Sequence, residues 1–344
     1  MRIAGTTLTL VFLMFLFVGL SFGADVDQAA LKQAQQLFSP LPKVMESEQN
    51  PVTPEKAGLG KMLFYEMRIS MDGTVSCAKC HPISLYGADG LRKAIGNHCE
   101  VNPRNAPTVF NAAAQISEHW IGNRTSVEDQ AKQSLTGHPA FGMAKYEDVE
   151  KRLKGYKEYV ALFSRAFPGD MNPVTVENFA KAVGAFERTL VTPSPFDSFL
   201  KGEEKALTAV QKKGLETFMN TGCAGCHSGT YVGGQMYQKF GIVNLYWKHT
   251  KSEKIDEGRY AVTKNEADKY VFKVPVLRNV EKTPPYFHDG SVDDLETAVT
   301  IMGKVQLGRD ISSEQARDIS EFLKALTGEI PADVMTVPLL PSIE

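Results

Sequence analysis

Two five-residue segments of the chain carry residue types that can do metal chemistry at a fixed spacing. Residues 77–81 read CAKCH and residues 223–227 read CAGCH, so each places a histidine directly after a Cys-x-x-Cys pair. This pattern is the signature of c-type haem attachment, in which both thiols bond to the porphyrin and the histidine ligates the iron. The sequence therefore predicts two covalent haem c groups. The predicted attachment residues are Cys77, Cys80, His81, Cys223, Cys226 and His227.

Other uses of paired cysteines fit the sequence less well. A zinc ribbon needs its two knuckles about 15 to 20 residues apart, whereas these pairs lie in opposite halves of the chain. A thioredoxin-like motif belongs to a βαβ unit, and neither pair follows a β-branched run. Cys99 stands outside both pairs. It is either a buried small apolar residue or a free reactive thiol.

Composition and the N-terminus narrow the class of protein. The chain has 344 residues, 43% of them hydrophobic, and a formal net charge of -2, which favours two globular domains and gives no reason to expect a nucleic-acid partner. An apolar run, LTLVFLMFLFVGL, precedes the small residues of SFGAD. This layout predicts a signal peptide over residues 1–24 and export to the periplasm, because the run is shorter than the ~20 residues of a membrane-spanning helix.

Helix signals surround both motifs. Thr53 can cap a helix over PEKAGLGKMLF and Thr208 can cap one over AVQKKGLETFMN, which gives a weak internal repeat with one haem per copy. Ser312 and Gly328 are the expected start and stop of a later helix. Two stripes at helical spacing predict buried faces. They comprise Val176, Phe179, Ala180, Val183, Phe186 and Leu190, and Ala316, Ile319, Phe322, Leu323 and Leu326.

The predicted fold is mostly α, with two cytochrome c-like domains that each hold one covalently bound c-type haem. The stretch TPSPFDSFLKGEEK is rich in proline, serine and charge, which favours a linker over residues 192–205. The domains are then expected over residues 25–191 and 206–344.

Longer motifs make the sequence similar to the bacterial dihaem cytochrome c peroxidases. The similarity runs through nearly the whole mature chain and includes LGKMLFYEMRIS, PRNAPTVFNAA, NPVTVENFAKAVGAFERTL, DEGRYAVT, YVFKVPVLRNV, PPYFHDGS and IMGKVQLGR. The resemblance implies a periplasmic enzyme that reduces hydrogen peroxide to water with electrons from a small cytochrome c or cupredoxin. It also implies that one haem relays electrons while the other, held by Cys77, Cys80 and His81, is peroxidatic. Family members are commonly dimers, so a homodimer is expected.

Two axial ligands follow from the resemblance. Met302 is the expected second ligand of the electron-accepting haem, and a His/Met pair raises the reduction potential; the alternative is a core methionine. Related MauG-type enzymes carry tyrosine there, so Met302 disfavours an oxidase. On the peroxidatic haem, many members have a resting histidine ligand directly after IG. Here the stretch reads AIGNHCE, with Asn97 at that place, so His98 is the candidate ligand and a surface histidine is the alternative.

The resemblance also assigns roles between and around the haems. Trp120 in EHWIGNR matches a tryptophan that couples the two haems, with ordinary core packing as the alternative. A calcium ion bound by carbonyl oxygens and waters is implied at Asn105, Thr283 and Pro285. The remaining histidines, His119, His249 and His288, lack ligand spacing.

One departure from the family concerns proton transfer. Cleavage of an O–O bond needs a group that takes and returns a proton, and the family supplies a glutamate aligned close to Ala140 and Phe141. No carboxylate occurs between Asp129 and Glu147. His138 is the candidate replacement because its unperturbed pKa suits the task; a loop histidine is the alternative. A peroxidase and a dihaem electron carrier with little peroxide chemistry therefore both stay open.

Overall fold

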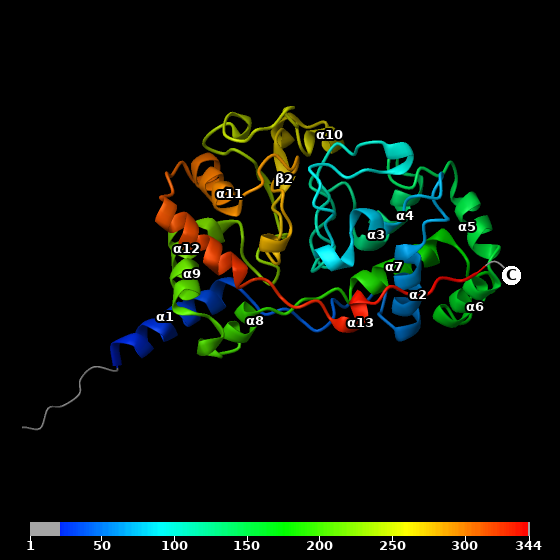
Figure 1. The fold of residues 1–344 in the computed structure, drawn as a ribbon, viewed down its shortest axis with the longest axis horizontal. Helices are drawn as coiled ribbons and strands as arrows, with labels where there is room; N and C mark the ends of the chain where they lie inside the picture. The colour runs from blue at the N-terminus through cyan, green and yellow to red at the C-terminus, as the bar shows by residue number, and fades with distance from the viewer. Residues whose placement is uncertain (1–20, 343–344) are drawn as a thin grey trace, which may run out of the picture.

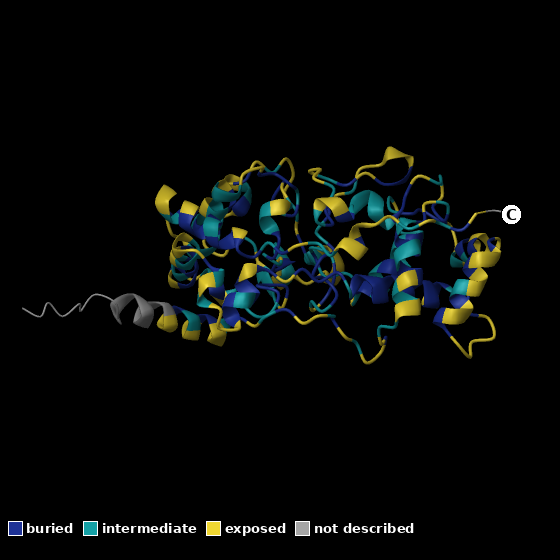
Figure 2. Ribbon diagram, turned by 60° about the horizontal axis from the view of Figure 1, so that its bottom comes forward, coloured by how far each residue is buried: buried dark blue, intermediate teal, exposed yellow. Residues whose placement is uncertain are grey.

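The structure, a computed structural model, describes residues 21–342. The predicted signal peptide lies almost wholly outside the described residues. The chain is mostly helical and forms two lobes that lie side by side in Figure 1. Figure 2 shows buried residues gathered where the lobes meet and exposed residues on the outer faces of the helices. Among residues 21–342, no helix combines the length and the apolar character needed to cross a membrane.

Each lobe has its own set of helices. The helices of the first lobe are α2 (Pro54–Tyr65), α3 (Cys77–Cys80), α4 (Val127–Thr136), α5 (Tyr146–Lys154), α6 (Lys157–Ala166) and α7 (Val176–Glu187). The helices of the second lobe are α8 (Pro195–Leu200), α9 (Ala209–Thr221), α10 (Tyr260–Thr263), α11 (Leu295–Met302) and α12 (Ser313–Lys324). The terminal helices are α1 (Ser21–Leu37) and α13 (Ala332–Met335).

The remaining elements are short. The single-turn 3₁₀ helices are η1 (Ile83–Leu85), η2 (Asn97–Cys99), η3 (Glu204–Ala206), η4 (Cys223–Gly225), η5 (Tyr246–Lys248), η6 (Glu266–Asp268) and η7 (Val280–Lys282), and a π-helical turn, η8, spans Gly303–Leu307. Strands β1 (Tyr237–Lys239) and β2 (Val271–Lys273) pair antiparallel, with Gln238 opposite Phe272.

The helix starts read from the sequence are confirmed. The hydroxyls of Thr53, Thr208 and Ser312 each accept a hydrogen bond from a backbone N–H in the first turn of the helix that follows. This contact satisfies one of the donors that a helix start leaves unpaired. Both predicted apolar stripes are buried, one along α7 and the other along α12.

The same close helix contact supports both haem-binding motifs. In the first lobe α2 crosses α7 at Gly60, where a Cβ atom would stand 1.8 Å from the carbonyl oxygen of Ala182. In the second lobe α9 crosses α12 at Gly214, where a Cβ would stand 2.0 Å from the carbonyl oxygen of Asp318. Because only glycine permits this approach, the internal repeat extends to the packing behind each motif.

Two segments near the junction differ from the sequence expectation. The stretch expected as a linker contains α8, whose Phe196 and Phe199 are fully buried in the core of the second lobe. The expected stop at Gly328 is wrong, because α12 ends at Lys324. Gly328 instead lies against the carbonyl oxygen of Thr192, which a Cβ would approach to 2.2 Å. Where the two domains divide stays a prediction.

Candidate functional site

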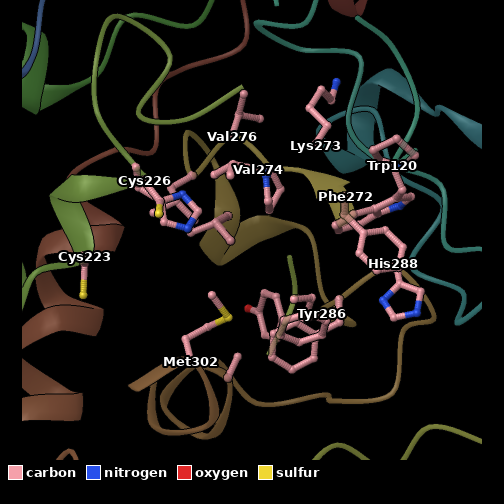
Figure 3. A pocket seen from close by; sticks show the side chains of 18 of the residues that line it. Trp120, Cys223, Cys226, Phe272, Lys273, Val274, Val276, Tyr286, His288 and Met302 are labelled. Atoms are coloured by element: carbon pink, nitrogen blue, oxygen red, sulfur yellow. The ribbon is translucent and has the colours of Figure 1, made fainter. Parts of the chain in front are cut away.

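A cavity of about 240 Å³, lined mostly by the second lobe and in part by the first, carries the second Cys-x-x-Cys-His motif on its wall. Cys223 begins η4 directly after α9, and Cys226 and His227 also line the cavity. Met302, the last residue of α11, lines it too. In Figure 3 the Met302 sulfur points into the cavity, with Cys226 on the opposite side. The structure thus brings together the four residues that were assigned to one haem.

The chemistry of this cavity fits a haem group. Burial lowers the pKa of His227 to about 4, although the carbonyls of Val232 and Pro275 act in the opposite direction. The neutral imidazole is the form that ligates a metal ion. Burial also raises the pKa of Cys223 and of Cys226. The cavity therefore offers two protonated thiols, a neutral imidazole and a thioether, which is the set that a His/Met-ligated haem c requires.

Local structure fixes the position of Met302. The Asp294 carboxylate caps α11 by accepting a hydrogen bond from the Thr297 N–H at 2.7 Å. At the other end, η8 begins at Gly303, which packs so closely against Ile311 that a Cβ would lie 2.2 Å from its Cγ1. These contacts hold both ends of the helix that presents the thioether.

Trp120 lies between segments of the two lobes. Its indole N–H donates to the carbonyl of Asn105 at 3.0 Å, and its own carbonyl accepts from the Lys273 N–H at 2.8 Å. Its ring approaches His288 edge-on, with 6.4 Å between the ring centroids. Figure 3 places Trp120 and His288 on the side of the cavity away from Cys223. Trp120 therefore has contacts suited to a residue that couples the two lobes.

The three residues expected to bind calcium line the same cavity. Asn105, Thr283 and Pro285 all contribute to its wall. The Asn105 side chain donates a hydrogen bond to the carbonyl of Leu91 at 2.8 Å. Within residues 21–342 no group of three or more His, Cys, Asp or Glu side chains could hold a metal ion. A calcium ion here would consequently depend on carbonyl and amide oxygens and water.

The first motif occupies a separate place in the first lobe. Cys77 and Cys80 bound α3, and His81 follows as its C-cap. The His81 Nδ1 lies 3.0 Å from the carbonyl oxygen of Gly87. A carbonyl can only accept, so Nδ1 carries the proton and Nε2 keeps its lone pair for a metal. Burial lowers the pKa of His81 and raises the pKa of Cys80 to about 11. The first motif thus also fits a haem group.

A loop over residues 96–100 is fastened to residues 139–140. The backbone N–H and the side-chain amide of Asn97 each donate to the Pro139 carbonyl at 2.8 Å, and the amide also donates to the Ala140 carbonyl at 2.9 Å. Asn97 is completely buried. Its neighbour His98 is exposed, with its Nε2 3.3 Å from the Met71 sulfur. The structure therefore leaves the candidate ligand His98 on the surface.

Cys99 is also exposed. The expectation of a buried apolar cysteine is wrong, because this part of the loop faces solvent. His98 and Cys99 both have left-handed backbone angles, with φ of 51° and 59°. Two successive residues of this kind are uncommon outside glycine.

The fold supplies His138 with a carboxylate that the local sequence lacks. The Nδ1 of His138 lies 3.0 Å from Oε2 of Glu100, and about half of each side chain is exposed. Phe141, near the family's glutamate position, is buried in the core of the first lobe. Glu100 could not be identified from the sequence, because nothing in either segment indicates that the two loops meet.

A second feature that the sequence did not indicate is a buried charged pair beside Trp120. Lys273 Nζ lies 3.7 Å from Glu118 Oε2 and donates to the Gln115 side chain at 2.6 Å and the Ser117 carbonyl at 2.7 Å. Burial raises the pKa of Glu118 and lowers the pKa of Lys273. The pair joins residues 115–120 of the first lobe to β2 of the second, so it helps to hold the two lobes together.

Comparison with known proteins agrees with this geometry. Residues 54–205 match the family model for di-haem cytochrome c peroxidase. Cytochrome c551 peroxidase of Pseudomonas aeruginosa is 42% identical over 94% of this chain and 93% of its own. The chain belongs to the di-haem cytochrome c peroxidase family. The cytochrome c551 peroxidase of Nitrosomonas europaea is 38% identical, again over 94% of this chain and 93% of its own.

A solved structure of a MauG-like protein supports the same fold. A MauG-like protein associated with microbial copper homeostasis superposes with a TM-score of 0.75 at 25% identity, over 87% of this chain and 97% of its own. Membership of the di-haem cytochrome c peroxidase family confirms the predicted fold class and the prediction of two haem groups. The roles of individual residues stay predictions.

Proposed function

We propose that this chain is an exported cytochrome c peroxidase that reduces hydrogen peroxide to water with electrons from a small periplasmic redox protein. The main support is the 42% identity to a cytochrome c551 peroxidase over 94% of this chain. This chain also contains both haem-attachment motifs. Haem, when bound, supplies iron that accepts single electrons and that can bind peroxide. The reaction consumes one peroxide, two electrons and two protons and releases two waters.

The second lobe is proposed to receive the electrons. Cys223 and Cys226 would hold the haem, and His227 and Met302 would ligate its iron. The thioether raises the reduction potential relative to a nitrogen ligand, so this centre accepts electrons readily. Trp120 is proposed to couple it to the first lobe, which its hydrogen bonds to residues on both sides support.

The first lobe is proposed to carry out the peroxide chemistry. Cys77, Cys80 and His81 would hold its haem, and His138 would move the proton. His138 would accept a proton from hydrogen peroxide and return it as water forms. Glu100, at 3.0 Å, stabilises the charged ring that exists between these two steps. Exposure of both side chains lets the site exchange protons with solvent.

Calcium, the location and the oligomeric state belong to the same proposal. A calcium ion at Asn105, Thr283 and Pro285 would stiffen the wall shared by the cavity and Trp120. A periplasmic location rests on the predicted signal peptide. A homodimer rests on the family resemblance alone.

A dihaem electron carrier is the second candidate function. It is favoured by one observation, the buried Phe141 near the place where the family has its glutamate. The deciding experiment is hydrogen-peroxide turnover by the haem-loaded protein with calcium and a reduced one-electron donor. We expect sustained turnover. Negligible turnover while both haems remain redox-active would favour the carrier.

A further inference from the structure

A buried carboxylate with no part in the proposed peroxide chemistry lies at the wall of the second-lobe cavity. Glu118 and Lys273 both line this cavity, together with Met302 and the second attachment motif. Figure 3 places Lys273 beside Trp120, across the cavity from Met302. The Glu118 side chain is 10% exposed. A charge buried this far is costly, so its partners decide which protonation state the fold favours.

Glu118 is less well paired than the buried Asp197. Among the described residues, Oε1 of Glu118 has no hydrogen-bond partner, and its Oε2 meets the Lys273 Nζ only at 3.7 Å. Lys273 donates its own hydrogen bonds to other groups. Asp197, by contrast, accepts two hydrogen bonds from Arg278 alone. Burial raises the pKa of Glu118, and Lys273 opposes that rise. The anionic form of Glu118 is therefore weakly stabilised by hydrogen bonds.

The charged and titratable groups around Glu118 come from several elements. Burial lowers the pKa of His119 to about 4 and raises the pKa of Glu187 well above its ordinary value, which favours the neutral form of both. Burial would also raise the pKa of Glu128, but Arg188 holds it below its ordinary value. Of these groups, Glu118 is the carboxylate at the cavity whose charge the surroundings fix least. The full set is Lys273 in β2, Glu128 in α4, Glu187 and Arg188 at the C-terminal end of α7, and His119 and Arg124 in the same segment as Glu118.

We propose that Glu118, which lies against Lys273, takes up one proton when the second haem is reduced. The added electron makes the cavity more negative, and in a buried site this charge strongly disfavours a nearby carboxylate. Glu118 gains a proton from solvent through the exposed part of its side chain and releases it when the electron moves on. This inference rests on the proposed function, in which the second haem receives the electrons. It adds that the protein takes up a proton with each electron.

The direct test is a redox titration of the second haem in the haem-loaded protein at a series of pH values. A reduction that binds a proton becomes less favourable as protons become scarce, so the potential should fall as the pH rises. One proton per electron gives a slope of up to about 59 mV per pH unit. A potential that is independent of pH across the neutral range would overturn the proposal.

Variants at position 118 separate proton uptake from a structural role. Glu118→Gln cannot take up the proton, so its potential should lose the pH dependence and stay close to the native value at low pH. Glu118→Asp keeps a carboxyl group and should retain the slope. Glu253→Gln, at an exposed glutamate of the second lobe, is the matched control and should keep the native profile. A native slope in Glu118→Gln would show that another group binds the proton and would overturn the proposal.

Infrared difference spectroscopy keeps the proposal testable if Glu118→Gln fails to retain haem. Reduction of the second haem in the native protein should produce the absorption of a newly protonated carboxyl group. That band should shift when water is replaced by deuterium oxide, and its frequency should change in Glu118→Asp. Absence of the band, or a band that is identical in Glu118→Asp, would refute proton uptake by Glu118.

The potential and the turnover separate this inference from the proposed function. A pH-dependent potential that is lost in Glu118→Gln, in a protein without peroxide turnover, would refute the peroxidase and leave the inference intact. A pH-independent potential in a protein that turns over peroxide would refute the inference and leave the peroxidase intact.

Discussion

The two lobes hold the same attachment motif in different surroundings. In the second lobe the motif shares an apolar cavity with the thioether of Met302, which lies at the end of a capped helix. In the first lobe the neighbouring loop is polar, with Asn97 fastened to a segment that ends in His138, Pro139 and Ala140. The motif therefore determines which group is bound, whereas the residues around it determine what that group does.

The largest expected effect comes from removing the thioether that distinguishes the second lobe. Met302→Leu should lower the reduction potential of one haem by on the order of 0.2 V, within the ~0.8 V that axial ligands span. Met219→Leu, at another buried methionine of this lobe, is the matched control and should leave both potentials in place. Spectroscopic redox titration measures both. An unaltered potential in Met302→Leu would show that Met302 is not a ligand of the second-lobe haem.

Buried ion pairs also differ between the lobes. Asp197 in α8 accepts hydrogen bonds from Arg278 at 2.8 and 3.0 Å, and both side chains are almost fully buried. Asp197→Ala should lower the free energy of unfolding by about 3–5 kcal/mol, because it leaves the buried Arg278 charge without a partner. In the first lobe Glu128 pairs with Arg188 at 2.9 Å, and its side chain is 18% exposed. Glu128→Ala should therefore lower the free energy of unfolding by less. Urea unfolding measures both, and equal losses would remove the distinction.

The Asp197 pair also predicts a pH dependence. Burial alone would raise the pKa of Asp197, but Arg278 and the N–H groups of Leu41 and Ser194 hold it below its ordinary value. Because its pKa is lower in the folded protein, the Asp197 carboxylate stabilises the fold at pH values above its unfolded-state pKa of about 3.9. That contribution should fall as the pH drops through the lowered pKa. Unfolding measured from pH 6 down to acid should show a steeper loss in the native protein than in Asp197→Ala.

A smaller effect is expected at His138, the proposed proton-transfer residue of the first lobe. His138→Ala should slow peroxide turnover by about 10²-fold while the haem spectra stay unchanged. His249→Ala, at an exposed histidine of the second lobe, is the control and should keep the native rate. Steady-state kinetics measure the difference. Full turnover in His138→Ala would remove this residue from the mechanism.

The smallest effect tests what the lobes share. Gly60→Ala and Gly214→Ala should each cost about 1–3 kcal/mol, because the added methyl group overpacks the helix crossing. Gly58→Ala in α2 is the matched control, since a Cβ there meets no atom within 4 Å. That change should be neutral or stabilising, as alanine favours a helix over glycine. A large loss in only one lobe would show that the two crossings are not equivalent.

Local patterns in the sequence predicted the features that depend on neighbouring residues. Thr53, Thr208 and Ser312 were identified as helix caps because a cap acts over three residues. The attachment motifs were identified because their chemistry is contiguous. Both apolar stripes were identified because one helix face buries one periodic set.

Features that depend on distant contacts were not predictable. Glu100 meets His138 only because two loops approach each other, and neither loop has a pattern that predicts the meeting. The proline-rich stretch at residues 192–205 was expected to be a linker from its composition, yet Phe196 and Phe199 bury α8 in the second core. Composition reports average exposure, whereas burial depends on the partner surface.

We expect electrons to enter the protein at the haem of the second lobe and to leave it at the haem of the first. The most direct test mixes hydrogen peroxide rapidly with protein in which only the Met302 haem is reduced, and follows its reoxidation. We expect fast, peroxide-dependent reoxidation that is abolished when Cys77 and Cys80 are replaced by alanine. Equally fast reoxidation in the protein without the first haem would contradict it.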